Sequence, residues 1–213
     1  EWYRVGWDHL RLIDETAELV RAALSLLGRD ATLRVVRYRD LYRDALGIDP
    51  FTASEDELRE ALGDVEIDPA GLSRDDWLDL LLTHRLQPAF DSEGLLAIVD
   101  YPASQCALAR LRDDGDGLPV AERFELYLGP LELANGYHEL RDATEQRSRF
   151  ARDGALRQAR GDVVPPMDDH LLAALDGRLP ACAGVALGVD RLLMAMLATP
   201  RIADVLAFEF NRA

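Results

Sequence analysis

The chain has 213 residues, which is enough for one domain with a substantial core or for one domain with a small appendage. Its 48% hydrophobic and 30% charged residues are typical of an ordinary globular protein, and its net charge of −15 tells against a broad nucleic-acid interface, which needs a basic face. No apolar run is long enough for a transmembrane helix and no basic-then-apolar leader is visible, so we expect a cytosolic protein without membrane contact.

The first forty residues predict the end of a strand, a helix and a second strand. Residues 1–4 carry two aromatic side chains before any turn residue, which is typical of the end of a strand. From 9 to 27 apolar residues recur at helical spacing, with Asp8 placed to cap the helix and Gly28 placed to end it. The β-branched segment 32–38 then suits a short strand.

The next fifty residues, roughly 40–90, are predicted to form a small helical insertion in a larger domain. Glycines and prolines interrupt this stretch, and two serines mark the starts of helices within it. Ser54 precedes a helix expected over 55–62, and Ser73 precedes a helix expected over 74–84.

After Pro88 the pattern changes to strands joined by turns, with an acidic, solvated turn over 113–117. The expected strands cover 95–99, 122–128 and 131–136. The expected helices cover 142–160 and 168–175; a strand and a helix follow from Gly184, and 202–208 closes the chain. Because neighbouring strands are joined by turns, we predict an α+β domain on a mainly antiparallel sheet flanked by helices.

The stretch from Gly184 to Arg191 predicts an anion site. Its first half is small and apolar, as in a buried strand, and an apolar helix begins at Arg191. Such a junction leaves unpaired N–H groups at the positive end of the helix, and arginine adds planar donors suited to phosphate. A nucleotide phosphate would fit there; a surface arginine at a common kind of turn is the alternative interpretation.

Two carboxylates, Glu132 and Glu139, stand seven residues apart in the second informative stretch. On a regular strand this odd spacing sends them to opposite faces, so they converge only if Asn135-Gly136 forms a bulge or bend. If they converge beside Arg191, they make an oxygen site for Mg²⁺ next to a phosphate-binding arginine. The alternative is that both glutamates are simply solvated.

Other chemical motifs are missing. The sequence has no Walker loop, GxGxxG, HExxH or GxSxG, and its four histidines are scattered. Cys106 and Cys182 stand without a CxxC partner, which predicts buried free thiols.

Segments 131–136 and 184–191 together resemble the C-terminal half of class II lysyl-tRNA synthetase catalytic domains, and motif 3 of that class corresponds to 184–197. The resemblance is closer to the synthetase-like ligases that attach β-lysine to elongation factor P, the family also called PoxA or GenX. Further segments point the same way: 1–4, 101–105, 121–125, 136–140 and 207–213. A lysyl-tRNA synthetase would usually carry serine at His138 and glycine at Ala186. The resemblance covers essentially all of 1–213, which is identified as part of one catalytic domain.

The resemblance implies a role for each of seven residues. It implies that Glu132 and Leu133 contact ATP, that Gly188 lies against the adenosine and that Arg191 binds the γ-phosphate. It implies that Glu132 and Glu139 hold Mg²⁺, that Glu139 also recognises an amino group of the substrate, and that Tyr3 lines the amino-acid pocket. Ala186 would narrow that pocket relative to glycine, which would favour a β-amino acid over α-lysine.

The implied reaction is an AMP-forming, ATP-dependent ligation in the cytoplasm. It activates (R)-β-lysine as an adenylate and transfers it to a lysine side chain of elongation factor P, by positioning and charge neutralisation without a catalytic triad. In that family, motif 1 and most of motif 2 precede the position of Glu1, so we expect an inactive C-terminal fragment of a homodimeric protein that does not use tRNA. A lysyl-tRNA synthetase fragment and a non-catalytic synthetase-like paralogue are the alternatives.

Overall fold

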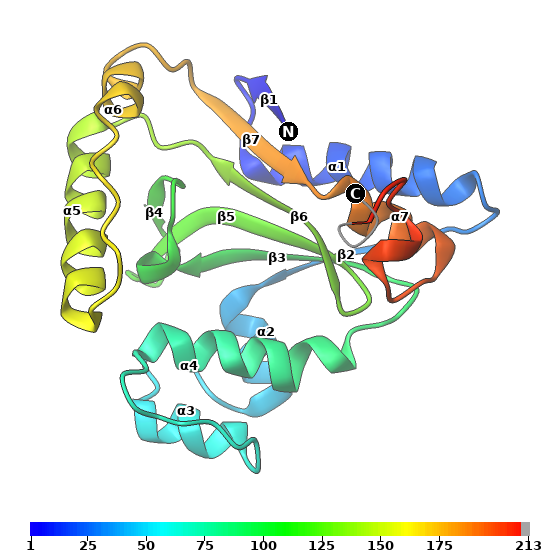
Figure 1. Cartoon of the computed structure of the whole chain (residues 1–213), viewed down its shortest axis with the longest axis horizontal. Helices are drawn as coiled ribbons and strands as arrows, with labels where there is room; N and C mark the ends of the chain where they lie inside the picture. The colour runs from blue at the N-terminus through cyan, green and yellow to red at the C-terminus, as the bar shows by residue number, and fades with distance from the viewer. Residues whose placement is uncertain (210–213) are drawn as a thin grey trace.

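A mixed sheet of seven strands organises the structure, which is a computed structural model that describes residues 1–209 (Figure 1). The strand order is β1-β7-β6-β5-β3-β2, with β4 paired to β5. The strands are β1 Trp2–Val5, β2 Leu33–Arg37, β3 Leu95–Pro102, β4 Leu111–Asp113, β5 Pro119–Leu128, β6 Leu131–His138 and β7 Cys182–Leu187. Every neighbouring pair is antiparallel except β2 and β3, so the predicted α+β class with a mainly antiparallel sheet is confirmed.

The helices divide between the two faces of the sheet and its ends. The α-helices are α1 His9–Ser25, α2 Tyr38–Leu46, α3 Glu55–Leu62, α4 Arg74–Leu81, α5 Ala143–Arg160, α6 Asp169–Leu175 and α7 Val189–Leu197. Helix α1 lies across one face, α2 to α4 lie beneath the other face near β2 and β3, and α5 with α6 projects as an arm at one end (Figure 1). None of the helices between residues 1 and 209 is long and apolar enough to cross a membrane.

Helix α1 forms as predicted because its ends and its apolar face are both encoded locally. The Asp8 carboxylate accepts a hydrogen bond from the Arg11 amide at 2.9 Å, which caps the N-terminus. Its apolar residues recur three and four apart and are fully buried: Leu12, Ile13, Ala17, Val20 and Leu24. They pack on the inward side chains of the three central strands, among them Phe124, Leu126 and Val185.

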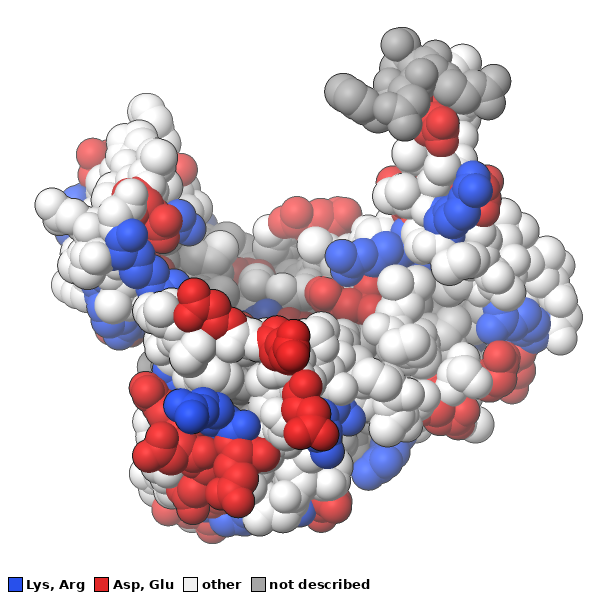
Figure 2. All heavy atoms as spheres, turned by 60° about the horizontal axis from the view of Figure 1, so that its bottom comes forward, with Lys and Arg blue, Asp and Glu red and all other residues white. Residues whose placement is uncertain are grey.

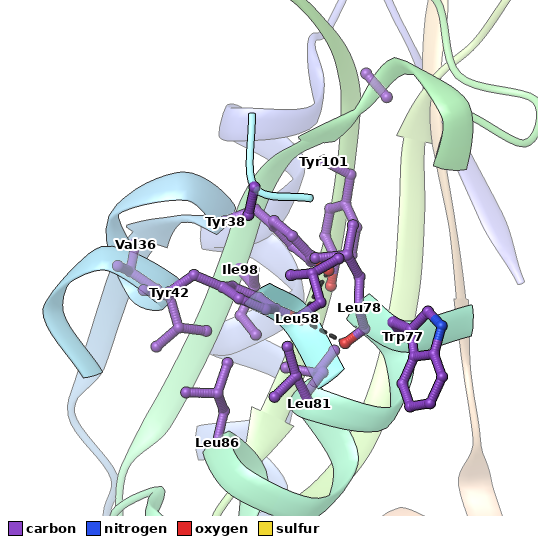
Figure 3. Close-up of a cluster of buried hydrophobic side chains, with 14 of the residues drawn as sticks. Val36, Tyr38, Tyr42, Leu58, Trp77, Leu78, Leu81, Leu86, Ile98 and Tyr101 are labelled. Atoms are coloured by element: carbon purple, nitrogen blue, oxygen red, sulfur yellow. Dashed lines mark hydrogen bonds between the residues drawn. The ribbon is translucent and has the colours of Figure 1, made fainter. Parts of the chain in front are cut away.

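The second hydrophobic core joins α2, α3 and α4 to the opposite face of the sheet (Figure 3). The Tyr38 hydroxyl donates to the Tyr42 hydroxyl at 2.8 Å, and Tyr42 donates to the Leu78 carbonyl oxygen at 2.6 Å, so two buried phenols are satisfied within the core. Figure 3 shows Tyr101 and Leu58 beside this pair. The helices of segment 40–90 therefore share a core with the sheet.

The predicted elements agree with the structure, with corrections at their ends. Capping boxes at Ser54 and Ser73 start α3 and α4, as expected. The helix expected over 74–84 ends as an α-helix at Leu81 and continues as one π-helical turn, Leu82–Leu86. Strand β4 was not predicted, because three residues offer too little period-two pattern to detect. Both cysteines are buried and unpaired, as expected.

The structure describes only part of the C-terminal segment of the chain. The closing segment 202–208 contains a short 3₁₀ turn, Ile202–Asp204. Residues 210–213, which contribute to the resemblance of 207–213, lie outside the described residues. The assignment of 1–213 to one partial domain with an insertion stays a prediction.

Replacing Tyr42 by Phe is expected to destabilise the fold by about 1–3 kcal/mol, because it leaves the buried Tyr38 hydroxyl without an acceptor. Tyr38→Phe is expected to cost less, because Tyr42 still donates to Leu78. Urea unfolding of the two single variants and the double variant measures the coupling. If Tyr38→Phe costs as much as Tyr42→Phe, the order of donors described above is wrong.

Candidate active site

The candidate site lies on the part of the sheet that none of the helices described in residues 1–209 covers. Helix α1 packs on the other face of β5, β6 and β7, while α2 packs beside β2 and β3. The arm formed by α5 and α6 rises on one side of this open region and residues 198–209, which follow α7, rise on the other. Figure 2 shows the molecule hollowed between them.

A β-bulge at Leu133 sets which side chains face this hollow. Opposite β6, Leu126 of β5 pairs with Ala134, but the next residue, Tyr127, pairs with Glu132. Leu133 is therefore an extra residue in β6. Leu133 and Ala134 are both buried in the core beneath α1, so the alternation of faces restarts after them.

The bulge places Glu132 and Glu139 on one face of the sheet, but by a different route from the predicted one. The bend was expected at Asn135-Gly136, where the pairing with both neighbouring strands is regular. That expectation was wrong because the extra residue is Leu133. Its apolar side chain packs in the core, so the bulge forms there and not at Asn135-Gly136. Without the bulge, the odd spacing would have sent the two carboxylates to opposite faces.

Arg191 and Glu132 meet at one end of the site. Gly188 is the N-cap of α7 and its amide donates to the Leu133 carbonyl oxygen at 2.9 Å, which ties the start of the helix to the bulge. Arg191, in the first turn, donates from Nη1 to the Glu132 carbonyl oxygen at 3.0 Å and to Glu132 Oε2 at 3.3 Å. Its side chain is half exposed and faces solvent beside the positive end of α7, as an anion-binding arginine requires.

The Glu132 carboxylate has the properties of a cation ligand. Burial, and then the charge of Glu125 nearby, raise the pKa of Glu132, and Arg191 offsets part of that rise. Burial therefore disfavours the charged form of Glu132 even though Arg191 and Arg123 offset the charge of Glu125. Hard carboxylate oxygens are the ligands that Mg²⁺ prefers, so Glu132 fits the predicted ion.

Glu139 lies at the other end of β6, beside Tyr3 and Gly184. The pKa of Glu139 is raised to about 7, first by burial and then by the charge of Glu1. The Tyr3 hydroxyl in turn donates a hydrogen bond to Glu1. A second carboxylate and a phenol therefore lie near the Glu139 carboxylate, which forms no ion pair within residues 1–209.

Gly184 provides the space for this group. Tyr3 pairs with Gly184 across β1 and β7. A Cβ atom at Gly184 would overlap the Tyr3 ring and would lie 2.5 Å from Glu139 Oε1. Only glycine lets both side chains lie over the strand at this position.

Glu132 and Glu139 lie toward opposite ends of β6 and are influenced by different charges. The charges that act on Glu132 are those of Glu125, Arg191 and Arg123, whereas the charge that acts on Glu139 is that of Glu1. A Mg²⁺ ion shared by both carboxylates stays a prediction.

The remaining predicted residues are Ala186, Gly188 and Leu133, of which the first two are exposed and the third is buried. Ala186 is exposed and pairs with Asn135 across β7 and β6, so its methyl group lies between the two ends of the site. Gly188 is also exposed. The Leu133 side chain is buried in the core, so any contact of Leu133 with ATP would have to come from its main chain.

A polar network on β5 and β6 was not predicted. Arg123 bonds Glu125 and the Gln105 carbonyl oxygen and lies over the Tyr101 ring at 4.5 Å, while Asn135 donates to the Tyr137 hydroxyl at 3.0 Å. Arg123, Glu125 and Tyr127 alternate along β5, and this period-two spacing of polar and aromatic residues was the available signal. Glu1 was also missed as a site residue, because its role depends on the pairing of β1 with β7.

Comparisons with known proteins agree with this geometry. Residues 27–212 match the family described as tRNA synthetases class II (D, K and N). The curated relatives include the elongation factor P–(R)-β-lysine ligases of Salmonella arizonae and Salmonella gallinarum, each 41% identical over 216 residues. The alignments cover 100% of this chain and 65% of each relative, so the chain spans about two thirds of their length. The chain belongs to the class II tRNA synthetase family of the D, K and N type.

Proposed function

We propose that the protein to which this chain belongs is an ATP-dependent, AMP-forming ligase that activates (R)-β-lysine and transfers it to a lysine side chain of elongation factor P. The observation that carries the proposal is the charge arrangement along β6. Carboxylates surround Tyr3 at one end, and Arg191 with the start of α7 lies at the other. The 41% identity to two ligases of that name supports the choice of substrates.

The carboxylate end suits the amino groups of a diamino acid. Glu139 is buried with Glu1 nearby, and a bound ammonium group would supply the missing positive charge. Tyr3 would line this pocket and hold Glu1 by its hydroxyl. A neutral side chain would leave both carboxylates uncompensated, so the site discriminates against neutral amino acids.

The arginine end suits the phosphates of ATP. Arg191 would bind the γ-phosphate, while exposed Gly188 lets the adenosine approach the main chain at the start of α7. Glu132, with Glu139 as a second candidate, would hold Mg²⁺. When bound, this ion would neutralise charge on the phosphate oxygens. Because Arg191 bonds Glu132 directly, one arginine can position both the carboxylate and the nucleotide.

The proposed reaction has two steps. A carboxylate oxygen of β-lysine attacks the α-phosphorus of ATP, and the bond to the pyrophosphate oxygen breaks, which gives β-lysyl-adenylate and pyrophosphate. The lysine amine of elongation factor P then attacks the carbonyl carbon, AMP leaves, and the nitrogen loses a proton as the amide forms. The residues of the site contribute by orienting the two substrates and by balancing charge.

Ala186 is proposed to set the preference for a β-amino acid. Its exposed methyl group lies on the site face between the amine end and the phosphate end. Relative to glycine this methyl narrows the pocket where the backbone atoms of the substrate would lie. One methyl group in such a pocket typically changes discrimination by about 10- to 200-fold.

The proposal also covers the location, the oligomeric state and the acceptor of the protein. We propose a cytoplasmic protein that acts as a homodimer. The net charge of −15 tells against tRNA as the acceptor, because a polyanion would meet a predominantly acidic surface.

Incubation of the complete gene product with ATP, Mg²⁺, β-lysine and elongation factor P tests the proposal by mass spectrometry of the factor. We expect the factor to gain one β-lysyl group. No mass gain, combined with charging of tRNA by α-lysine, would instead identify a lysyl-tRNA synthetase. Failure of both reactions would identify a non-catalytic paralogue.

In the same assay, Arg191→Ala is expected to lower the adenylation rate about 10²- to 10³-fold, as loss of one preorganised donor to developing charge commonly does. Arg201→Ala is the matched control, because the Arg201 side chain is 70% exposed and, within residues 1–209, pairs with Asp204. Equal rates for the two variants would contradict the assigned role of Arg191.

Gly184→Ala is expected to destabilise the protein by about 1–3 kcal/mol and to weaken β-lysine binding at least tenfold, because the new methyl group displaces Tyr3 and Glu139. Gly154→Ala is the control. Gly154 lies within α5, and a Cβ atom there meets only Val164 at 3.4 Å. That variant should be stabilised by about 0.5–1 kcal/mol. Unchanged β-lysine affinity in Gly184→Ala, measured by calorimetry, would place the amine elsewhere.

Glu139 gives the folded protein a specific pH dependence in the absence of Mg²⁺ and substrate. Its folded pKa of about 7 lies above the ordinary value of 4.5, so its contribution to stability is fully present below pH 4.5 and is lost as the pH rises to 7. The advantage of Glu139→Gln over the wild type should therefore grow by about 2–3 kcal/mol between pH 4.5 and 7, and then level off.

Urea unfolding at several pH values measures this difference. Glu18→Gln, at an exposed position of α1, is the control and should follow the wild type throughout. A flat difference between Glu139→Gln and the wild type would show that Glu139 is solvated rather than buried beside Glu1.

A further inference from the structure

Three ionisable side chains meet on the face of the sheet opposite the candidate site. They are His9 at the start of α1, Glu122 on β5 and His138 at the end of β6. One ligand atom from each lies within 4.8 Å of the others. Because side chains alternate along β6, His138 faces α1 although the next residue, Glu139, faces the hollow.

Within this cluster, the imidazole of His9 is unpaired, while Glu122 and His138 pair with each other. Among residues 1–209, both ring nitrogens of His9 are buried without a hydrogen-bond partner, whereas His138 Nδ1 lies 2.9 Å from Glu122 Oε2 and Arg110 Nε lies 2.6 Å from the same oxygen. His9 is only 2% exposed. Each unpaired nitrogen costs about 1–3 kcal/mol if nothing binds it. An unpaired ring nitrogen of buried His9 within 4.8 Å of the Glu122–His138 pair therefore points to a bound species.

The donor set identifies the class of that species. Two imidazoles and one carboxylate are the ligands of Zn²⁺ and of neighbouring divalent transition ions, whereas Mg²⁺ and Ca²⁺ take oxygen ligands throughout. Ligands at about 2.1 Å from a tetrahedral ion lie roughly 3.4 Å apart. Side-chain shifts of about an ångström would bring the three ligand atoms to that spacing. A fourth position would be left to water.

Two arginines oppose cation binding and set its expected strength. Arg110 Nε lies 2.6 Å from Glu122 Oε2, and Arg112 Nε lies 3.7 Å from Glu122 Oε1. The Arg110 side chain is 48% exposed and can move into solvent when an ion arrives. Arg112 keeps a second partner in Asp100 at 2.5 Å. Binding must therefore displace Arg110, which weakens it relative to a site with an unpaired carboxylate.

We propose that His9, Glu122 and His138 bind a divalent transition ion of the zinc type. The bound ion joins the first turn of α1 to β5 and β6 directly behind Glu139. The site is separate from the proposed Mg²⁺ position at Glu132, which lies on the other face of the sheet at the other end of β6. It does not depend on the proposed ligase activity.

Titration of the metal-free, complete protein with Co²⁺, followed by visible absorption, tests the proposal. We expect one Co²⁺ ion to bind, to be displaced by Zn²⁺, and to bind at least tenfold more weakly to His9→Gln and to His138→Gln. His170→Gln is the matched control, because His170 is an exposed histidine of α6 and should leave binding unchanged. Zn²⁺ should also raise the melting temperature of the wild type.

Arg110→Ala keeps the test decisive if the histidine variants fail to fold. Removal of this competitor frees Glu122, so Co²⁺ should bind more tightly to Arg110→Ala than to the wild type. Absence of stoichiometric Co²⁺ binding would overturn the proposal and leave water as the bound species. Equal affinity in the wild type, His9→Gln and Arg110→Ala would overturn it as well, because the ion would then bind elsewhere.

Discussion

One extra residue in β6, Leu133, determines the chemistry of both faces of the sheet. In a regular strand, either Glu132 or the series Asn135, Tyr137 and Glu139 would point into the core beneath α1. Burying an unpaired carboxylate among apolar side chains costs several kcal/mol, so neither arrangement would be stable. The bulge removes this conflict by placing Leu133 and Ala134 together in the core.

The bulge is stabilised by the segment that also forms the arginine end of the site. A bulge leaves main-chain groups without their usual partners on the neighbouring strand. The Gly188 amide satisfies one of them by donating to the Leu133 carbonyl oxygen. Arg191 donates a hydrogen bond to the neighbouring group, the Glu132 carbonyl oxygen. The start of α7 and the bulge are therefore one structural unit. A change that straightened β6 would release Arg191 as well as rotate Glu132.

The sequence could predict local features and the two functional segments, but not their relation. Asp8, Ser54 and Ser73 act on amides three residues away, so their helices could be read from short windows. The position of the bulge depends on whether Leu133 or Asn135 is better buried, which only the packing of α1 decides. The contact of Tyr3 with Gly184 joins opposite ends of the chain, and no local pattern encodes it.

Strand β6 acts as a spacer between two opposite charge environments. At one end, the carboxylates of Glu139 and Glu1 favour binding of a cation. At the other end, Arg191 and the first turn of α7 favour binding of an anion. A small molecule with amino groups at one end and an acyl-phosphate at the other would satisfy both at once. Moving Glu139 by one residue along the chain would turn it to the α1 face, where His138 and Glu122 already lie. The period of two in β6 thus decides which of its side chains face the site and which face α1.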